Sequence, residues 1–333
     1  MSTVIEARPP VREGGEIEAQ VNYLAKGVAR PVAYTFEPPP GTPWTTGELA
    51  PRRVKIRDAR PLAAAGALGL DASGFELVGH RSALADFADD AAIRSTYYAE
   101  VDALLRAAAG ALGLDASGFE LVGHRSALAD FADDAAIRST YYAEVDALLR
   151  AATGAEKIVI FDHTLRDSAH GSRATAALRE PVRRVHNDQT FSSAPRRVRD
   201  HLPEDEAAAR LRQRFAIINV WRALDVVERL PLALCDARTI APDDLVPSDL
   251  VYRDKVGETY SVVANPAHRW FYFPRLRADE VLLLKIYDSL DDGRARLSAH
   301  TAFDDPTTPD TAAPRRSIEV RALVFWPAAD AKR

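Results

Sequence analysis

Short apolar stretches separated by turn residues dominate the chain. Runs of about four to eight apolar or β-branched residues, bounded by Gly, Pro, Asp or Asn, are typical of strands. They predict strands at 19–24, 54–57, 157–161, 182–186, 215–221, 232–235, 259–263, 270–273, 281–286 and 318–325. A charged helix is expected at 205–213. The pattern favours a mainly β protein with flanking helices, whose core is a double-stranded β-helix of the jelly-roll or cupin-like type.

A tandem repeat occupies much of the first half of the chain. Residues 63–108 and 107–152 are identical, with a period of 44 residues. Two copies without a single difference indicate either a recent tandem duplication or an error in sequence assembly, since solenoid repeats usually diverge and number at least three. If the fold has room for one unit, the second copy is expected to fill it, because that copy continues directly into the rest of the chain.

Each copy predicts a short strand, at 75–78 and 119–122, followed by a helix. In the second copy the helix is expected to begin after Asp133 and Asp134, which are suitable N-cap residues, and to end at Gly154. Four residues at helical spacing would form its apolar face: Ile137, Tyr141, Val145 and Leu148. We therefore expect an N-terminal α+β elaboration at 1–156 and a core at 157–333, within one compact domain overall.

Composition and charge narrow the classes of function. The 333 residues are 47% hydrophobic, with a net charge of -5 and a pI near 5.9, whereas a nucleic-acid surface needs a basic stripe. No stretch approaches the ~18 apolar residues of a membrane-spanning helix, and the N-terminus lacks the apolar segment of a signal peptide. The single cysteine, Cys235, suits a reducing compartment. We expect a cytoplasmic protein that binds neither nucleic acid nor a membrane.

The triplet His186-Asn187-Asp188 is the strongest chemical signal, and it ends the apolar stretch 182–185. A histidine and a carboxylate two residues apart on a strand point to the same side. Together with one remote histidine they form the 2-His-1-carboxylate facial triad, which leaves open positions on non-haem Fe(II).

Recognisable sequence blocks surround this triplet and continue to the end of the chain. They are FDHTLR, VHNDQT, RRVRDHLP, INVWRAL, PLALCDARTI, VGETYSVV, NPAHRWFYFP, LLLKIYDS, HTAFDDP and SIEVRALVF. In these blocks the chain resembles the CmcJ/NvfI-like family of oxidoreductases, related to the AsaB-type hydroxylase/desaturases. The resemblance implies an Fe(II)/2-oxoglutarate-dependent oxygenase that uses O2 to hydroxylate or desaturate a small secondary metabolite or its precursor. A partner enzyme of the same pathway would be expected.

The resemblance also implies that His186 and Asp188 are iron ligands and that a remote histidine is the third. We favour His268, which follows Gly257-Glu258 by ten residues with the predicted strand 259–263 between them. That layout is similar to the Gly-Asp, strand, His arrangement of phytanoyl-CoA-hydroxylase-like oxygenases, although Glu258 stands in place of the Asp.

His300 is the rival third ligand. It precedes Arg315-Arg316-Ser317, and an Arg-x-Ser after the distal histidine binds 2-oxoglutarate in other oxygenases. The 114 residues between His186 and His300 make this arrangement long. His163 is expected to order a strand end or line the pocket, while His80 and His124 are duplicates with a structural role.

A buried cation should bind the distal carboxylate of 2-oxoglutarate. Lys285 and Arg321 stand inside the apolar runs 281–286 and 318–325, where an unpaired cation would be costly, and Arg222 follows Trp221. The sequence does not decide among these three, and a structural ion pair is an alternative for each.

Two other classes of function remain open at this stage. A zinc-dependent hydrolase could use the same two histidines and aspartate, with water at the open position. A non-catalytic β-helix binding protein, whose fold the duplication compromises, is the other.

Overall fold

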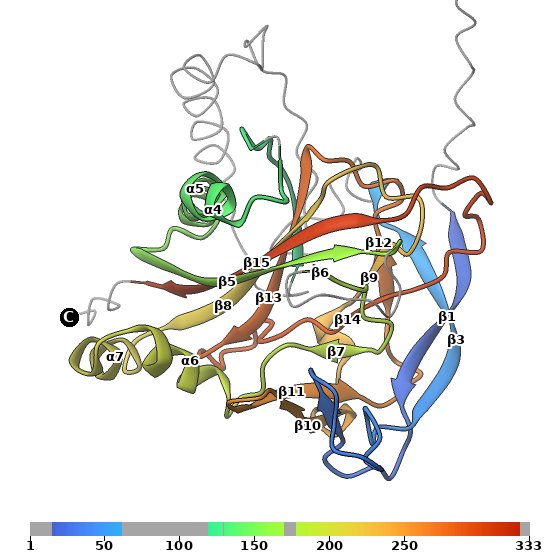
Figure 1. Cartoon of the computed structure of the whole chain (residues 1–333), viewed down its shortest axis with the longest axis horizontal. Helices are drawn as coiled ribbons and strands as arrows, with labels where there is room; N and C mark the ends of the chain where they lie inside the picture. The colour runs from blue at the N-terminus through green and yellow to red at the C-terminus, as the bar shows by residue number, and fades with distance from the viewer. Residues whose placement is uncertain (1–14, 62–118, 129, 170–177, 327–333) are drawn as a thin grey trace, which may run out of the picture.

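The structure, a computed structural model, describes residues 15–61, 119–128, 130–169 and 178–326. Two β-sheets form most of the protein, and the helices lie around the smaller sheet and at one end (Figure 1). The prediction of a mainly β protein with flanking helices is confirmed. The first repeat copy, with the strand expected at 75–78, lies outside the described residues. No helix in the described ranges is long and apolar enough to cross a membrane.

The larger sheet has nine strands in the order β1-β3-β12-β9-β14-β7-β11-β10-β2. Their bounds are β1 Glu16–Leu24, β2 Val32–Tyr34, β3 Leu49–Asp58, β7 His186–Asn187, β9 Leu232–Cys235, β10 Leu245–Val251, β11 Val256–Val262, β12 Trp270–Tyr272 and β14 His300–Ala302. Neighbours are antiparallel except for β3 with β12 and β10 with β2. The N-terminal strands therefore share a sheet with strands of the predicted core, while the division at residue 156 stays a prediction.

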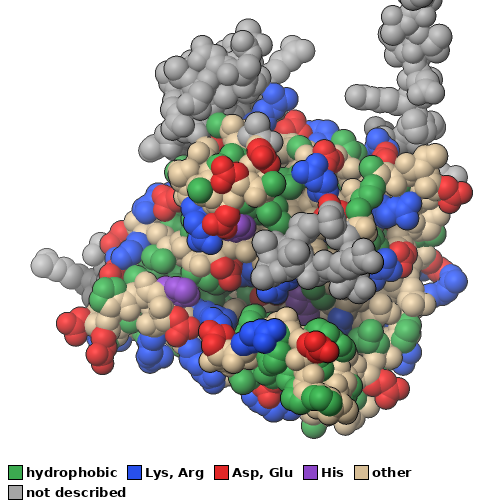
Figure 2. Space-filling view, in the orientation of Figure 1, with side chains coloured by type: hydrophobic (Ala, Val, Ile, Leu, Met, Phe, Trp, Pro, Cys, Tyr) green, Lys and Arg blue, Asp and Glu red, His purple; other side chains and the backbone are tan. Residues whose placement is uncertain are grey.

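The smaller sheet has six strands in the order β4-β13-β8-β15-β5-β6. Their bounds are β4 Phe119–Gly123, β5 Lys157–Asp167, β6 Leu178–Arg179, β8 Phe215–Ala223, β13 Glu280–Asp288 and β15 Arg316–Phe325. β4 comes from the second repeat copy and pairs with β13 at the edge of the sheet. Acidic and basic side chains are interspersed over the visible face of the molecule (Figure 2).

A shared apolar core joins the two sheets. Leu234 and Phe271 of the larger sheet pack in one buried cluster with Ile217, Leu284 and Leu323 of the smaller sheet. Because successive residues of a strand point to opposite faces, their neighbours on the smaller sheet point outward and pack against helices in a second cluster. Only the inward-pointing residues can contribute to a site between the sheets.

The helical part of the second repeat copy covers the outer face of the smaller sheet. α4 (Asp134–Ala136) starts after Asp133, whose carboxylate accepts hydrogen bonds from two backbone N–H groups. A π-helical turn, Ile137–Tyr141, leads into α5 (Tyr142–Thr153), and Gly154 ends it in the left-handed conformation at φ 65°. The predicted apolar face is confirmed, since all four of its residues are buried: Ile137, Tyr141, Val145 and Leu148.

Most predicted strands are present, but the stretch around the triplet differs. Only His186 of the range 182–186 belongs to a strand, because the residues before it make isolated hydrogen bonds with two different partners, β1 and β14. The helix expected at 205–213 is α7 (Glu204–Arg210), and α6 (Ala194–His201) precedes it. Four strands have no counterpart in the sequence prediction: β2, β6, β10 and β14.

Candidate metal centre

β7 and β14 are neighbours in the larger sheet, and their register places His186 directly opposite His300. Cross-strand partners point to the same face, and the two imidazole centroids are 4.5 Å apart. Asp188 follows β7 and brings a carboxylate oxygen to 3.5 Å from Nε2 of His186. One ligand atom of each of these three residues lies within 4.8 Å of the others. Two imidazoles and one carboxylate are the donor set of the facial triad.

Both histidines are oriented through Nδ1. The Nδ1 atom of His186 lies 2.8 Å from the carbonyl oxygen of Arg184, and that of His300 lies 3.2 Å from the carbonyl oxygen of Ser298. A neutral imidazole that donates from Nδ1 keeps the Nε2 lone pair for a metal. Burial, and then the nearby His186, lower the pKa of His300 to about 3, which keeps the ring neutral near pH 7.

Asp188 is held by two donors from the smaller sheet. Nδ2 of Asn219 and Nε of Arg321 donate to the same oxygen, Oδ2, at 2.8 and 3.1 Å. Burial alone would raise the pKa of Asp188, but the charge of Arg321 and the contact with His186 outweigh burial and hold the pKa well below its usual value. The carboxylate is therefore ionised, with Oδ1 directed at the histidines. Asn219 has a sequence signal that the prediction missed, because it is a polar residue inside an apolar strand.

The structure does not bring His268, the favoured third ligand, together with His186 and Asp188. Both of its ring nitrogens have protein partners: Nδ1 lies 3.0 Å from the hydroxyl of Tyr23, and Nε2 lies 3.1 Å from the carboxylate of Asp244. The ring also stacks on Tyr23, and its side chain is almost fully buried. His268 thus joins β1 to the turn before β10, and the rival His300 takes its place beside His186.

Two of the three predicted cations, Arg222 and Lys285, lie on the outer face of the smaller sheet. Arg222 bonds Tyr141 and contacts His124, which belong to the repeat unit on the outer face. Lys285 pairs in register with the outward-pointing Ile218 and forms an ion pair with Asp288 at 3.2 Å. These two residues therefore do not face the centre, and a structural ion pair explains Lys285.

Arg321 is the one predicted cation that faces the centre. Besides Asp188, its guanidinium bonds Asp162 and Thr164, each at 3.0 Å, and contacts Glu319. With all of these partners it orients Asp188 within a buried network.

Arg315 and Ser317 line the same inner face as Arg321. The guanidinium of Arg315 lies over the ring of Trp221, 5.4 Å from its centroid, and Trp221 belongs to the core between the sheets. Ser317 pairs with the inward-pointing Ala223. Nε of Arg315 and Oγ of Ser317 are buried and have no hydrogen-bond partner among the residues that the structure describes. These two atoms can receive an anion.

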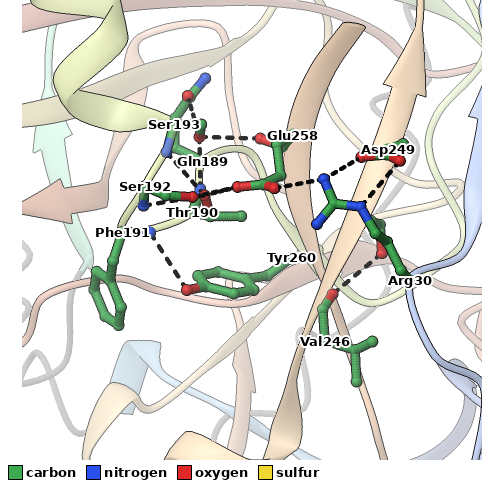
Figure 3. Close-up of polar contacts among 11 residues, drawn as sticks. Arg30, Gln189, Thr190, Phe191, Ser192, Ser193, Val246, Asp249, Glu258 and Tyr260 are labelled. Carbon is green, nitrogen blue, oxygen red and sulfur yellow. Dashed lines mark hydrogen bonds and ion pairs between the residues drawn. The ribbon is translucent and has the colours of Figure 1, made fainter.

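A network of hydrogen bonds fixes the loop that follows Asp188 (Figure 3). The hydroxyls of Thr190 and Ser192 each donate to Oε1 of Glu258 at 2.5 Å. Arg30, from the N-terminal part of the chain, bonds the other carboxylate oxygen of Glu258 at 2.9 Å and also pairs with Asp249. Glu258, which stands in place of the Asp of the Gly-Asp, strand, His layout, therefore anchors the ligand-bearing loop to β11.

The chain matches the sequence model of a family described as the oxidoreductase/YMDC permease-like domain, over residues 21–113 and 111–325. The break between these two stretches falls inside the tandem repeat. The α-ketoglutarate-dependent dioxygenase phiK, from a fungal species, is 34% identical over 323 residues, which cover 94% of this chain and 98% of that protein.

Other relatives align over a shorter region. The hydroxylase/desaturase efuI of Hormonema carpetanum is 41% identical over 157 residues, which cover 44% of this chain and 52% of that protein. For CTB9 of Cercospora beticola the alignment covers 44% of this chain and 48% of the relative, so the chain spans about half the length of these two proteins.

Among solved structures, the iron and α-ketoglutarate-dependent endoperoxidase NvfI superimposes with a TM-score of 0.70 at 28% identity. The match covers 93% of this chain and 98% of that chain. The expected double-stranded β-helix oxygenase fold is thereby confirmed. With the family match and the full-length similarity to phiK, the chain belongs to this oxidoreductase family, as its resemblance to CmcJ/NvfI-like proteins indicates.

Proposed function

We propose that the protein is an Fe(II)/2-oxoglutarate-dependent oxygenase that hydroxylates or desaturates a small secondary metabolite. The observation that carries the proposal is the convergence of His186, Asp188 and His300 from neighbouring segments of the larger sheet. The names of the similar proteins support the same chemistry, since they include hydroxylase/desaturases and α-ketoglutarate-dependent dioxygenases.

The residues present fit an Fe(II) ion. His186 and His300 offer Nε2 as donor atoms, and Asp188 offers one oxygen while Asn219 and Arg321 hold the other. When bound, Fe(II) with 2-oxoglutarate and O2 supplies the oxidising power for cleavage of a C–H bond. The chain's own contribution is to fix the orientation of the three ligands and to exclude water around them.

We infer that Arg315 and Ser317 bind the distal carboxylate of 2-oxoglutarate. Burial, the largest influence, and then the charge of Arg166 lower the pKa of Arg315 to about 9, and the charge of Glu319 offsets this only in part. A buried donor without a partner costs about 1–3 kcal/mol. A carboxylate that accepts from Nε of Arg315 and Oγ of Ser317 would remove this cost at both atoms.

Anaerobic titration with Fe(II) and 2-oxoglutarate tests the proposed function. A metal-to-ligand charge-transfer band in the visible range is expected only when both are present, and His186→Ala should abolish it. Folded wild-type protein that gives no band would refute the oxygenase proposal. The metal content of protein purified without chelators distinguishes the two candidate functions, because the oxygenase would hold iron and a hydrolase would hold zinc.

The same titration tests the carboxylate subsite. Arg315→Met should weaken 2-oxoglutarate binding about 10- to 100-fold, since it removes charge-assisted hydrogen bonds worth about 1.5–3 kcal/mol. Fe(II) affinity should stay unchanged. Arg316→Met is the matched control, because Arg316 points to solvent and pairs with the exposed Asp225. An unchanged affinity for 2-oxoglutarate in Arg315→Met would contradict this subsite.

We also propose a cytoplasmic location and a partner enzyme of the same pathway that supplies the substrate or consumes the oxidised product. Fractionation of the source cells tests the location.

A further inference from the structure

The second repeat copy is attached to the smaller sheet as a unit. We name residues 119–154, which form β4, α4 and α5, the docking unit. β4 pairs with β13 from Phe119 opposite Leu284 to Gly123 opposite Glu280. The helices lie over the sheet (Figure 1), and Val145 and Leu148 are buried against apolar residues of β8, β13 and β15.

Polar contacts complete the attachment. Arg222 of β8 bonds the hydroxyl of Tyr141 at 3.0 Å and contacts the ring of His124. On β5, Nδ1 of His163 lies 2.8 Å from the hydroxyl of Tyr142. The three residues that the docking unit contributes to these contacts belong to the duplicated sequence: His124, Tyr141 and Tyr142.

The first copy carries every one of these groups. His80, Tyr97, Tyr98 and Val101 are the counterparts of His124, Tyr141, Tyr142 and Val145. Residues 75–111 differ from 119–155 at a single position, where Ala109 replaces Thr153. Thr153 bonds the sheet through its backbone oxygen, which accepts from Trp326, so an alanine there preserves this contact. Gly110 repeats the glycine that ends the helix.

The first copy can also reach the same place. Arg60, just before the repeat, forms an ion pair at 2.8 Å with Glu280, the residue opposite the end of β4. In the docked position the strand starts opposite Leu284. Leu284 lies about 14 Å from Glu280 along β13, at ~3.4 Å per residue. The 13 residues 62–74 can span up to about 45 Å.

We propose that this face of the smaller sheet is a docking surface for either copy of the repeat, so that the chain has two interchangeable registers. In the register of the structure, 57 residues (62–118) separate Pro61 from the docked copy, and three residues (154–156) separate α5 from β5. In the other register the two links have 13 and 47 residues (62–74 and 110–156). The entropic cost of closing a link rises as about 1.5 RT times the logarithm of its number of residues. Summed over both links, this cost is lower in the observed register, which is therefore favoured about sevenfold in population. One substitution can reverse a difference of this size.

The test places a charge in the docked helix. Val145→Asp introduces a carboxylate at a fully buried position and should release the second copy. The first copy should then dock, and the melting temperature should fall by only a few degrees. Val101→Asp, the matched control in the first copy, should leave the melting temperature unchanged. The double variant, and Val145→Asp in a chain that lacks 63–106, should both lose most of the folded signal.

Hydrogen exchange identifies the docked copy directly, because the substitution makes otherwise identical peptides distinguishable. In Val145→Asp, peptides from 93–106 should become protected and those from 137–150 should exchange rapidly, with the reverse pattern in Val101→Asp. A Val145→Asp variant as unstable as the double variant, without protection at 93–106, would overturn the proposal. None of these measurements depends on metal binding, so their outcome is separate from that of the proposed function.

Discussion

Replacing His300 and His268 by alanine, one at a time, is expected to separate metal binding from stability. In the structure His300 has a hydrogen bond from Nδ1 to the carbonyl oxygen of Ser298, at 3.2 Å, and directs Nε2 at the centre. His268 has a partner at each ring nitrogen, Tyr23 at 3.0 Å and Asp244 at 3.1 Å.

The sizes of the two effects follow from these contacts. A neutral hydrogen bond contributes about 0.5–1.5 kcal/mol, and one to a charged group about 1.5–3 kcal/mol. His268→Ala loses one of each, so the free energy of unfolding should fall by about 2–4 kcal/mol. His300→Ala loses one neutral bond and should cost about 0.5–1.5 kcal/mol. Its metal affinity should fall by more than about 100-fold, since changes to residues that merely orient ligands already cost about 10- to 100-fold.

Urea unfolding of the metal-free variants and anaerobic calorimetric titration with Fe(II) measure the two quantities separately. His201→Ala is the control, because this exposed ring stacks on Phe161 and is not part of the ligand group. Loss of metal binding in His268→Ala, together with retention in His300→Ala, would refute the assignment of the third ligand.

Three further predictions follow from contacts described above. Asn219→Leu removes the amide that holds Asp188 and should weaken Fe(II) binding about 10- to 100-fold without loss of the fold; titration and circular dichroism check this, and unchanged affinity would contradict it. Glu258→Gln removes the charge that faces Arg30 and two hydroxyls, so the free energy of unfolding should fall by about 1–2 kcal/mol in urea denaturation, whereas wild-type stability would show that the charge is dispensable. Burial, and then the charge of Arg222, hold the pKa of His124 well below its usual value, so the ring stays neutral when folded and takes a proton when unfolded below about pH 6.5. Stability should therefore be unaffected by this group above about pH 6.5 and decrease below it, by about 1.4 kcal/mol per pH unit for each such histidine; a flat profile of urea midpoints between pH 7.5 and 5.5 would exclude the effect.

The elements that the sequence predicts well are those with a local signal. β8 and β13 are nearly continuous apolar runs, which is typical of strands buried on both faces. The repeat helix shows its apolar face at regular spacing and has a capping residue, Asp133, at its start. The pair His186 and Asp188 is likewise visible in three residues of sequence.

The third ligand has no such signal. β14 is only three residues long, and its pairing with β7 joins positions 114 residues apart, so the meeting of His300 with His186 is set by sheet topology. The face of the sheet to which Lys285 and Arg222 point depends on where the alternation of each strand begins. A shift of one residue turns a side chain to the opposite face. A β-bulge between Lys285 and Tyr287 changes that phase within β13.

The pairing of β4 with β13 also bears on the solubility of the protein. β13 contains four consecutive apolar residues, Val281–Leu284, and β4 is the strand that covers its outer edge. An apolar edge strand without a partner is a template for pairing with other chains and for aggregation. Partial unfolding that releases only the repeat unit would therefore produce an aggregation-prone species while the metal centre is still intact. If either repeat copy can dock as proposed, the other would cover this edge when the docked one is released.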